Sequence, residues 1–189
     1  MNTNTQSSLP ISAGAQKVVI GYLAVCGAVL ALLMVFGLLL RLGQGGMVPL
    51  PADLSYQVLT AHGIGMVGIS GLGGAAIMWY FLARQVALNS SILLLNLGLF
   101  LLGVVLILGA VFIGGFAGAW TFLYPLPAQS GGVWEAHVAA IYMVGVLLVG
   151  VGFLLLHLDT GWAILSRYGS LTKALGWPQM FGASNDDAP

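Results

Sequence analysis

Charge is scarce in this chain of 189 residues, which holds five basic and five acidic residues and is only 5% charged. Ordinary soluble domains carry about 25% charged residues, so this composition excludes a soluble globular domain. Cysteine is scarcer still, because Cys26 stands alone. A lone cysteine excludes an internal disulfide and a metal site built from several thiolates. We interpret Cys26 as a small buried apolar residue.

Apolar residues are abundant, at 59% of the chain, and the mean hydropathy is +1.02. A helix needs about 20 apolar residues to cross a hydrocarbon core of ~30 Å. Four stretches are long enough: 17–42, 55–83, 90–117 and 133–158. They are too long and too uniformly apolar for barrel strands. The first also exceeds the apolar region of a signal peptide, so we expect it in the mature chain. The sequence therefore predicts an all-α integral membrane protein, a four-helix bundle.

The basic residues predict the orientation of the bundle. With the N-terminus in the cytoplasm, Lys17, Arg84, Arg167 and Lys173 lie inside and only Arg41 lies outside. This arrangement obeys the positive-inside rule. We therefore expect both termini in the cytoplasm. We also expect the membrane to be the cytoplasmic membrane of a prokaryote.

The ends of the chain are more polar than the predicted spans. We expect a polar N-terminal tail over 1–16, a four-span domain over 17–168 and an interfacial or mobile C-terminal tail over 169–189. Within that last tail, 169–180 is expected to form a short interfacial helix with Trp177 at headgroup depth. Neither a second domain nor an internal repeat is apparent, so the chemistry must lie in the bundle or at its rim.

His62 stands inside the second predicted span, in the segment "YQVLTAHGIGMVG" of residues 56–68. Ionisable residues within a membrane are rare and usually functional, which makes His62 a candidate ligand. The alternative is a neutral imidazole bonded to a neighbouring carbonyl. Small residues on this span give room for a flat macrocycle or for close helix packing: Gly63, Gly65, Gly68, Gly71, Gly73 and Gly74. Met66 is interpreted as packing.

Two motifs of this sequence resemble a known family. The segment 56–63, "YQVLTAHG", resembles the start of the second transmembrane helix of haem-copper oxidase subunit I. The segment 120–127, "WTFLYPLP", resembles the loop before the fourth helix of that subunit, particularly in the B class of quinol and cytochrome c oxidases. The resemblance covers roughly 17–168, the first four of twelve spans. It implies that His62 is an axial ligand of a low-spin haem, of b type, with Gly63 and Gly65 beside it.

The chain also departs from that family. The copper ligands and the second low-spin haem ligand of subunit I come from helices that have no counterpart here. Three histidines, His62, His137 and His157, are too few for a copper site and the haem ligands together. No strip of polar residues resembles a complete proton pathway. We therefore expect no copper from this chain alone, and the chain by itself is not an oxygen reductase.

Three arrangements complete the iron coordination. Another chain supplies the missing oxidase helices, or His137 serves within the same chain, or further copies associate. A homotrimer would be the analogue of the three four-helix arcs of subunit I, although analogy of fold does not establish chemistry.

Other polar and aromatic residues mark the ends of the spans. His137, close to Glu135, has a second interpretation as an interfacial residue at the outer mouth of the fourth span. We interpret His157, near Asp159, as the polar exit of that span. Aromatic residues form an expected outer rim: Trp120, Tyr124 and Trp134.

The sequence thus predicts a membrane haem-binding electron-transfer protein that acts as a split subunit or a homo-oligomer, with a redox partner that the residues leave open. Electron transfer through a coordinated haem needs no catalytic base or nucleophile from the protein. The alternative is a haem-free membrane scaffold or assembly subunit of a respiratory complex.

Overall fold

The structure is a computed structural model that describes residues 9–118 and 129–182. Its four long helices are long and apolar enough to cross a membrane, which confirms the predicted all-α membrane bundle. They are α1 (Ala13–Gln44), α2 (Ala52–Leu82), α3 (Ser90–Leu108) and α4 (Ala136–Tyr168). A single π-helical turn, η1 (Gly109–Ile113), continues α3, and two one-turn helices, α5 (Leu171–Ala174) and α6 (Trp177–Met180), follow α4.

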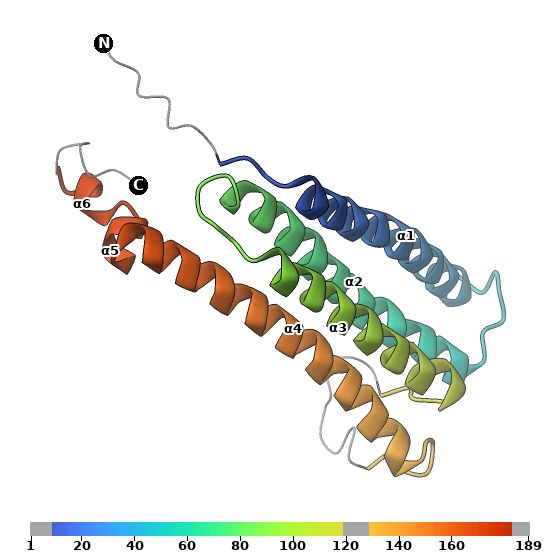
Figure 1. Ribbon diagram of the computed structural model, residues 1–189. Coiled ribbons are helices and arrows are strands. Elements are labelled where there is room, and N and C mark those ends of the chain that lie inside the picture. Colours follow the sequence, from blue (N-terminus) through green and yellow to red (C-terminus); the bar gives the residue numbers. More distant parts are fainter. Residues whose placement is uncertain (1–8, 119–128, 183–189) are drawn as a thin grey trace.

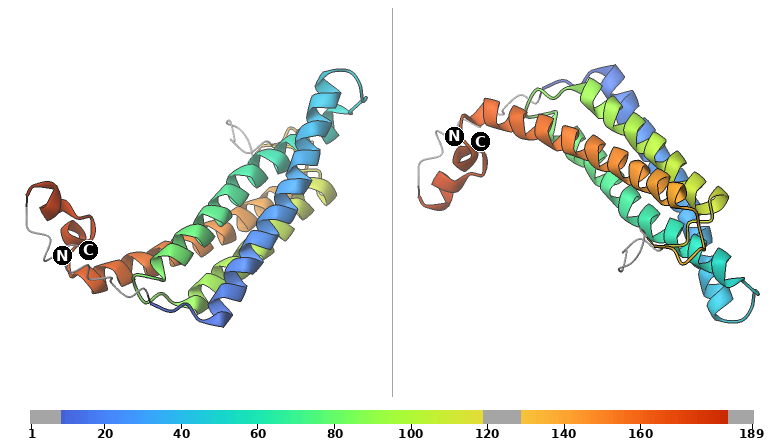
Figure 2. Two further views of the ribbon diagram at one scale, coloured as in Figure 1. Left: turned by 90° about the horizontal axis from the view of Figure 1, so that it is seen from above. Right: turned by 90° about the horizontal axis from the view of Figure 1, so that it is seen from below.

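The four helices run side by side along one axis and alternate in direction (Figure 1). The closest pairs are α1 with α2 and α3 with α4, so the bundle consists of two antiparallel hairpins. The beginning of α1 and the end of α4 lie at the same end of the bundle, and α4 projects beyond the other helices there (Figure 2). This arrangement agrees with the even number of predicted spans.

The α1 helix and the C-terminal end of α4 extend past the predicted spans because hydropathy marks only the apolar part of a helix, whereas α4 begins at Ala136, three residues after the predicted 133. Ser12 caps α1, and its Oγ accepts a hydrogen bond from the Ala15 amide at 3.1 Å, so α1 begins at Ala13, four residues before 17. α4 continues ten residues beyond 158 to Tyr168, where Gly169 ends it at φ 73°. Left-handed φ angles favour glycine. The third span ends at Ile113 rather than at 117, after the π-turn.

Residues 169–180 form two one-turn helices instead of the single short helix expected there. Gly176 separates them with a φ of 66°. A positive φ interrupts helical geometry, so glycine divides the segment.

Glycines let α3 and α4 approach each other closely. A β-carbon added at Gly103 would lie 2.6 Å from the Gly145 carbonyl oxygen, and one at Gly145 would lie 2.8 Å from the Gly103 oxygen. Further along the same seam, a β-carbon at Gly152 would lie 3.1 Å from Asn96 Nδ2. Small residues at a crossing increase van der Waals contact between membrane helices, where no hydrophobic effect drives association.

A buried polar contact joins the two hairpins. The Tyr22 hydroxyl of α1 lies 2.6 Å from the Leu93 carbonyl oxygen and 2.6 Å from Asn96 Oδ1, both on α3. Tyr22 and Asn96 are 0% and 1% exposed. A buried hydroxyl in an apolar surrounding is costly unless it is hydrogen-bonded, so this contact favours one alignment of α1 against α3.

Candidate functional site

His62 lies on α2 at the seam with α1. Its Nδ1 is 2.9 Å from the carbonyl oxygen of Leu33, and the ring is partly buried. Gly37, one turn further along α1, provides the space for the ring. A β-carbon there would lie 3.0 Å from His62 Cε1 and 3.5 Å from Nε2. The imidazole therefore rests against the backbone of α1.

This contact defines the chemistry available to the ring. A carbonyl oxygen only accepts hydrogen bonds, so Nδ1 carries the proton in the neutral imidazole, and Nε2 then carries the lone pair. Histidines that ligate metals have the same arrangement, in which the second ring nitrogen donates to a carbonyl or carboxylate. The contact therefore has the form of the alternative considered from the sequence, a neutral imidazole bonded to a neighbouring carbonyl. It also leaves Nε2 with a basic lone pair.

The glycines that follow His62 face different neighbours. Gly63 and Gly65 are both half-buried on α2. Added β-carbons would meet side chains of three helices: Leu33 at Gly65 (2.6 Å), Cys26 at Gly73 (3.7 Å), Phe100 at Gly68 (3.6 Å) and Phe153 at Gly71 (3.2 Å). At these four positions glycine serves helix packing within the chain. At Gly74 an added β-carbon meets nothing within 4 Å.

His137 is exposed in the first turn of α4. The phenyl ring of Phe153 on α4 lies beside Gly71 of α2, and the two helices run in the same direction. His62, nine residues before Gly71, is therefore at about the level of residue 144, seven residues or ~10 Å from the level of His137. The chain brings His62 to α1 but does not place His137 at the same depth, and the ligand role of His137 stays a prediction.

His157 is exposed on α4, where its Nδ1 lies 2.7 Å from the Phe153 carbonyl oxygen of the preceding turn. The α4 helix continues beyond His157 to Tyr168, and the interpretation of His157 as the polar exit of the span stays a prediction. Asp159 has a role that sequence reasoning missed, because its Oδ2 accepts a hydrogen bond from the backbone amide of Asn89 at 3.3 Å. Seventy residues separate the two, so no local pattern indicates this contact.

The remaining candidates have structural surroundings. Cys26 is half-buried, with Sγ 3.9 Å from the Ile69 carbonyl oxygen. Trp134 packs on Phe116 with ring centroids 4.9 Å apart, which places it in a packing contact. Met66 is 36% exposed. Two of the expected rim residues lie outside the described residues: Trp120 and Tyr124.

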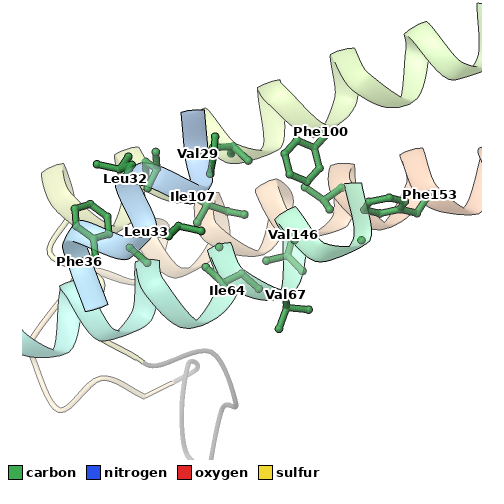
Figure 3. A pocket seen from close by; sticks show the side chains of 17 residues that line it. Val29, Leu32, Leu33, Phe36, Ile64, Val67, Phe100, Ile107, Val146 and Phe153 are labelled. Carbon is green, nitrogen blue, oxygen red and sulfur yellow. The ribbon is translucent and has the colours of Figure 1, made fainter. Parts of the chain in front are cut away.

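An apolar cavity of about 350 Å³ lies between the two hairpins (Figure 3). All four long helices contribute to it, and each side chain that lines it is apolar or is a glycine. Leu33, Gly65 and Phe100 are among the lining residues, whereas His62 is not. The cavity and the imidazole are therefore neighbouring but separate features.

Across residues 9–118 and 129–182, no three or more His, Cys, Asp or Glu side chains gather as a metal-binding group. Within these residues, His62 at the seam of α1 and α2 is therefore a candidate ligand without a cluster of other candidate ligands around it. Comparisons of the sequence with protein-family models, with curated proteins and with solved structures gave no match.

Proposed function

We propose that this chain is a membrane haem-binding electron-transfer protein in which His62 is an axial ligand of the haem iron. The observation that carries the proposal is the contact between His62 Nδ1 and the Leu33 carbonyl oxygen at 2.9 Å. It fixes the tautomer with a basic Nε2 and limits the rotation of the ring. The resemblance of residues 56–63 to a haem-ligating segment adds the identity of the group.

The residues around His62 fit one axial ligand. The Leu33 carbonyl holds the proton on Nδ1, and polarisation through this hydrogen bond makes Nε2 a stronger electron-pair donor to a metal. Gly37 adds no side chain at a position where a β-carbon would lie 3.5 Å from Nε2. His62 is partly buried, and burial of a haem site influences its redox potential. Haem would supply one-electron oxidation and reduction at its iron.

The second ligand comes from outside this chain under the proposal. His62 does not line the interior cavity, and His137 is exposed about 10 Å away along the bundle axis. A second copy, with a trimer as the analogous assembly, or a chain that carries the missing oxidase helices would provide it. The four helices then act as one arc of an oxidase-like subunit, with both termini in the cytoplasm of a prokaryote.

Optical spectroscopy of the protein purified from membranes tests this proposal. The wild type should show a Soret band and, after dithionite reduction, an α band. His62→Ala should lose at least nine-tenths of the haem per chain, because the iron loses its ligand. The matched control is His157→Ala, which removes an exposed imidazole from another helix and should leave the spectrum unchanged.

Two outcomes would overturn the proposal. One is a His62→Ala variant that keeps the wild-type haem content and spectrum. The other is a colourless wild type that stays colourless when it is produced with added haem precursor and extracted in mild detergent, which would favour the haem-free scaffold. Loss of haem in His157→Ala instead would assign the ligand to the opposite end of the bundle.

A further inference from the structure

The cavity between the hairpins is elongated along the bundle axis. Its lining runs from Val29 to Phe36 on α1 and from Ala61 to Gly71 on α2. At 1.5 Å per residue these stretches span ~10 and ~15 Å. The volume of the cavity is about 350 Å³.

The wall of the cavity selects an apolar guest. Its lining consists of apolar side chains and glycines, and apolar cavities of this kind exclude water but accept apolar molecules. A guest with polar groups would lose their hydrogen bonds inside. Gly65, Gly68 and Gly71 add no side chains of their own to the α2 wall, and Leu33, Phe100 and Phe153 pack over them.

The cavity reaches the surface that faces the membrane interior. Val67 and Leu32 line it and are 54% and 43% exposed, whereas Phe100 and Ile107 line it and are 3% and 6% exposed. The same cavity is therefore lined by exposed residues at its edge and by buried residues at its floor. Figure 3 shows Phe100 and Ile107 on the opposite side of the cavity from Val67.

We infer that one acyl chain of a membrane lipid occupies this cavity. The rim lies within the apolar spans, where the surrounding medium is acyl chain, and the lining extends over several turns of helices that are long enough to cross a bilayer. Residues 1–8 and 183–189 are polar in sequence, so neither end of the chain has the chemistry to fill it. The headgroup stays outside, and the site is independent of the proposed role of His62.

Photolabelling in vesicles tests the inference. The protein is reconstituted in phosphatidylcholine that contains a trace of phosphatidylcholine with a diazirine on its acyl chain, irradiated, and analysed by peptide mass spectrometry. We expect label on the floor residues Phe100 and Ile107, which bulk lipid does not reach. Label confined to outward residues of the same helix, such as Leu102 and Val105 at 52% and 66% exposure, would overturn the inference.

Two variants of α2 form a matched pair. Gly68→Leu places a side chain in the cavity, and its β-carbon would make ordinary contact with Phe100 at 3.6 Å. It should reduce label on Phe100 at least fivefold. Gly74→Leu, where an added β-carbon meets nothing within 4 Å, should label as the wild type does. Equal floor labelling in both variants would contradict occupation of the cavity.

Further controls separate the alternatives. Leu93 and Leu156 are 0% exposed and do not line the cavity, so label on them at the level of Phe100 would overturn the inference by showing general access to the core. Floor labelling by a diazirine-bearing isoprenoid but not by phosphatidylcholine would overturn the assignment to an acyl chain. His62→Ala should label as the wild type does, so failure of this inference and failure of the haem proposal are distinguishable.

Discussion

Gly145→Ala is expected to destabilise the bundle although alanine is the better helix former. The new β-carbon would lie 2.8 Å from the Gly103 carbonyl oxygen, 2.8 Å from Ile107 Cγ1 and 3.2 Å from the Ile107 amide nitrogen. Two of these three atoms are backbone, so a change of side-chain rotamer does not relieve the overlap. The α3 and α4 helices must separate by several tenths of an ångström.

The magnitude follows from dispersion at the crossing. A well-packed site of one side chain has about 50 atom contacts of ~0.15 kcal/mol each, and a gap of 0.5–1 Å forfeits a quarter to a half of each. The loss is about 2–4 kcal/mol, which overlaps the range seen for overpacked cores. Alanine recovers up to about 1 kcal/mol through its helix propensity. The net destabilisation should be about 1–4 kcal/mol.

Gly150→Ala is the matched control on the same helix, because a β-carbon at Gly150 meets nothing within 4 Å. It should be neutral or stabilising by up to about 1 kcal/mol. Unfolding of both variants by titration with denaturing detergent, followed by circular dichroism, measures the difference. If Gly145→Ala proves as stable as Gly150→Ala, the close approach of α3 to α4 is wrong.

Two further predictions concern α1. Gly37→Ala should displace the His62 ring, because the new β-carbon would lie 3.0 Å from Cε1. The tautomer distribution of His62 should then change, and the ¹⁵N NMR signals of its ring should report that change. Gly27→Ala, where an added β-carbon has open space, should leave them unchanged, and unchanged signals in both would refute the contact. Tyr22→Phe should cost about 0.5–2 kcal/mol in the same detergent titration, because it removes the hydroxyl that contacts Leu93 and Asn96. A loss below 0.2 kcal/mol would show that the buried contact contributes little.

The sequence predicted the membrane spans because hydropathy reports directly on the energy of placing residues in hydrocarbon. It did not predict that α4 continues through His157 and Asp159 to Tyr168, because a helix that leaves the apolar layer keeps its own hydrogen bonds and needs no further apolar residues. The π-turn before Gly114 likewise has no hydropathic signature.

For the candidate site, sequence reasoning selected His62 but not its partners. Leu33 is 29 residues away, and a backbone carbonyl has no residue-type signature, so only the packing of α1 on α2 reveals the contact. Glycine richness was also ambiguous. Gly65 and Gly71 each face a side chain of a different helix in the same chain, a division that composition cannot express.

Native mass spectrometry of the complex after mild detergent extraction tests the central claim that His62 binds haem in an assembly of chains. We predict an oligomer, or a complex with another chain, that carries haem, and a His62→Ala variant of the same chain composition without it. A monomer with one haem per chain would contradict ligation from two chains and assign the second ligand to His137. A haem-bearing His62→Ala complex would contradict the claim itself.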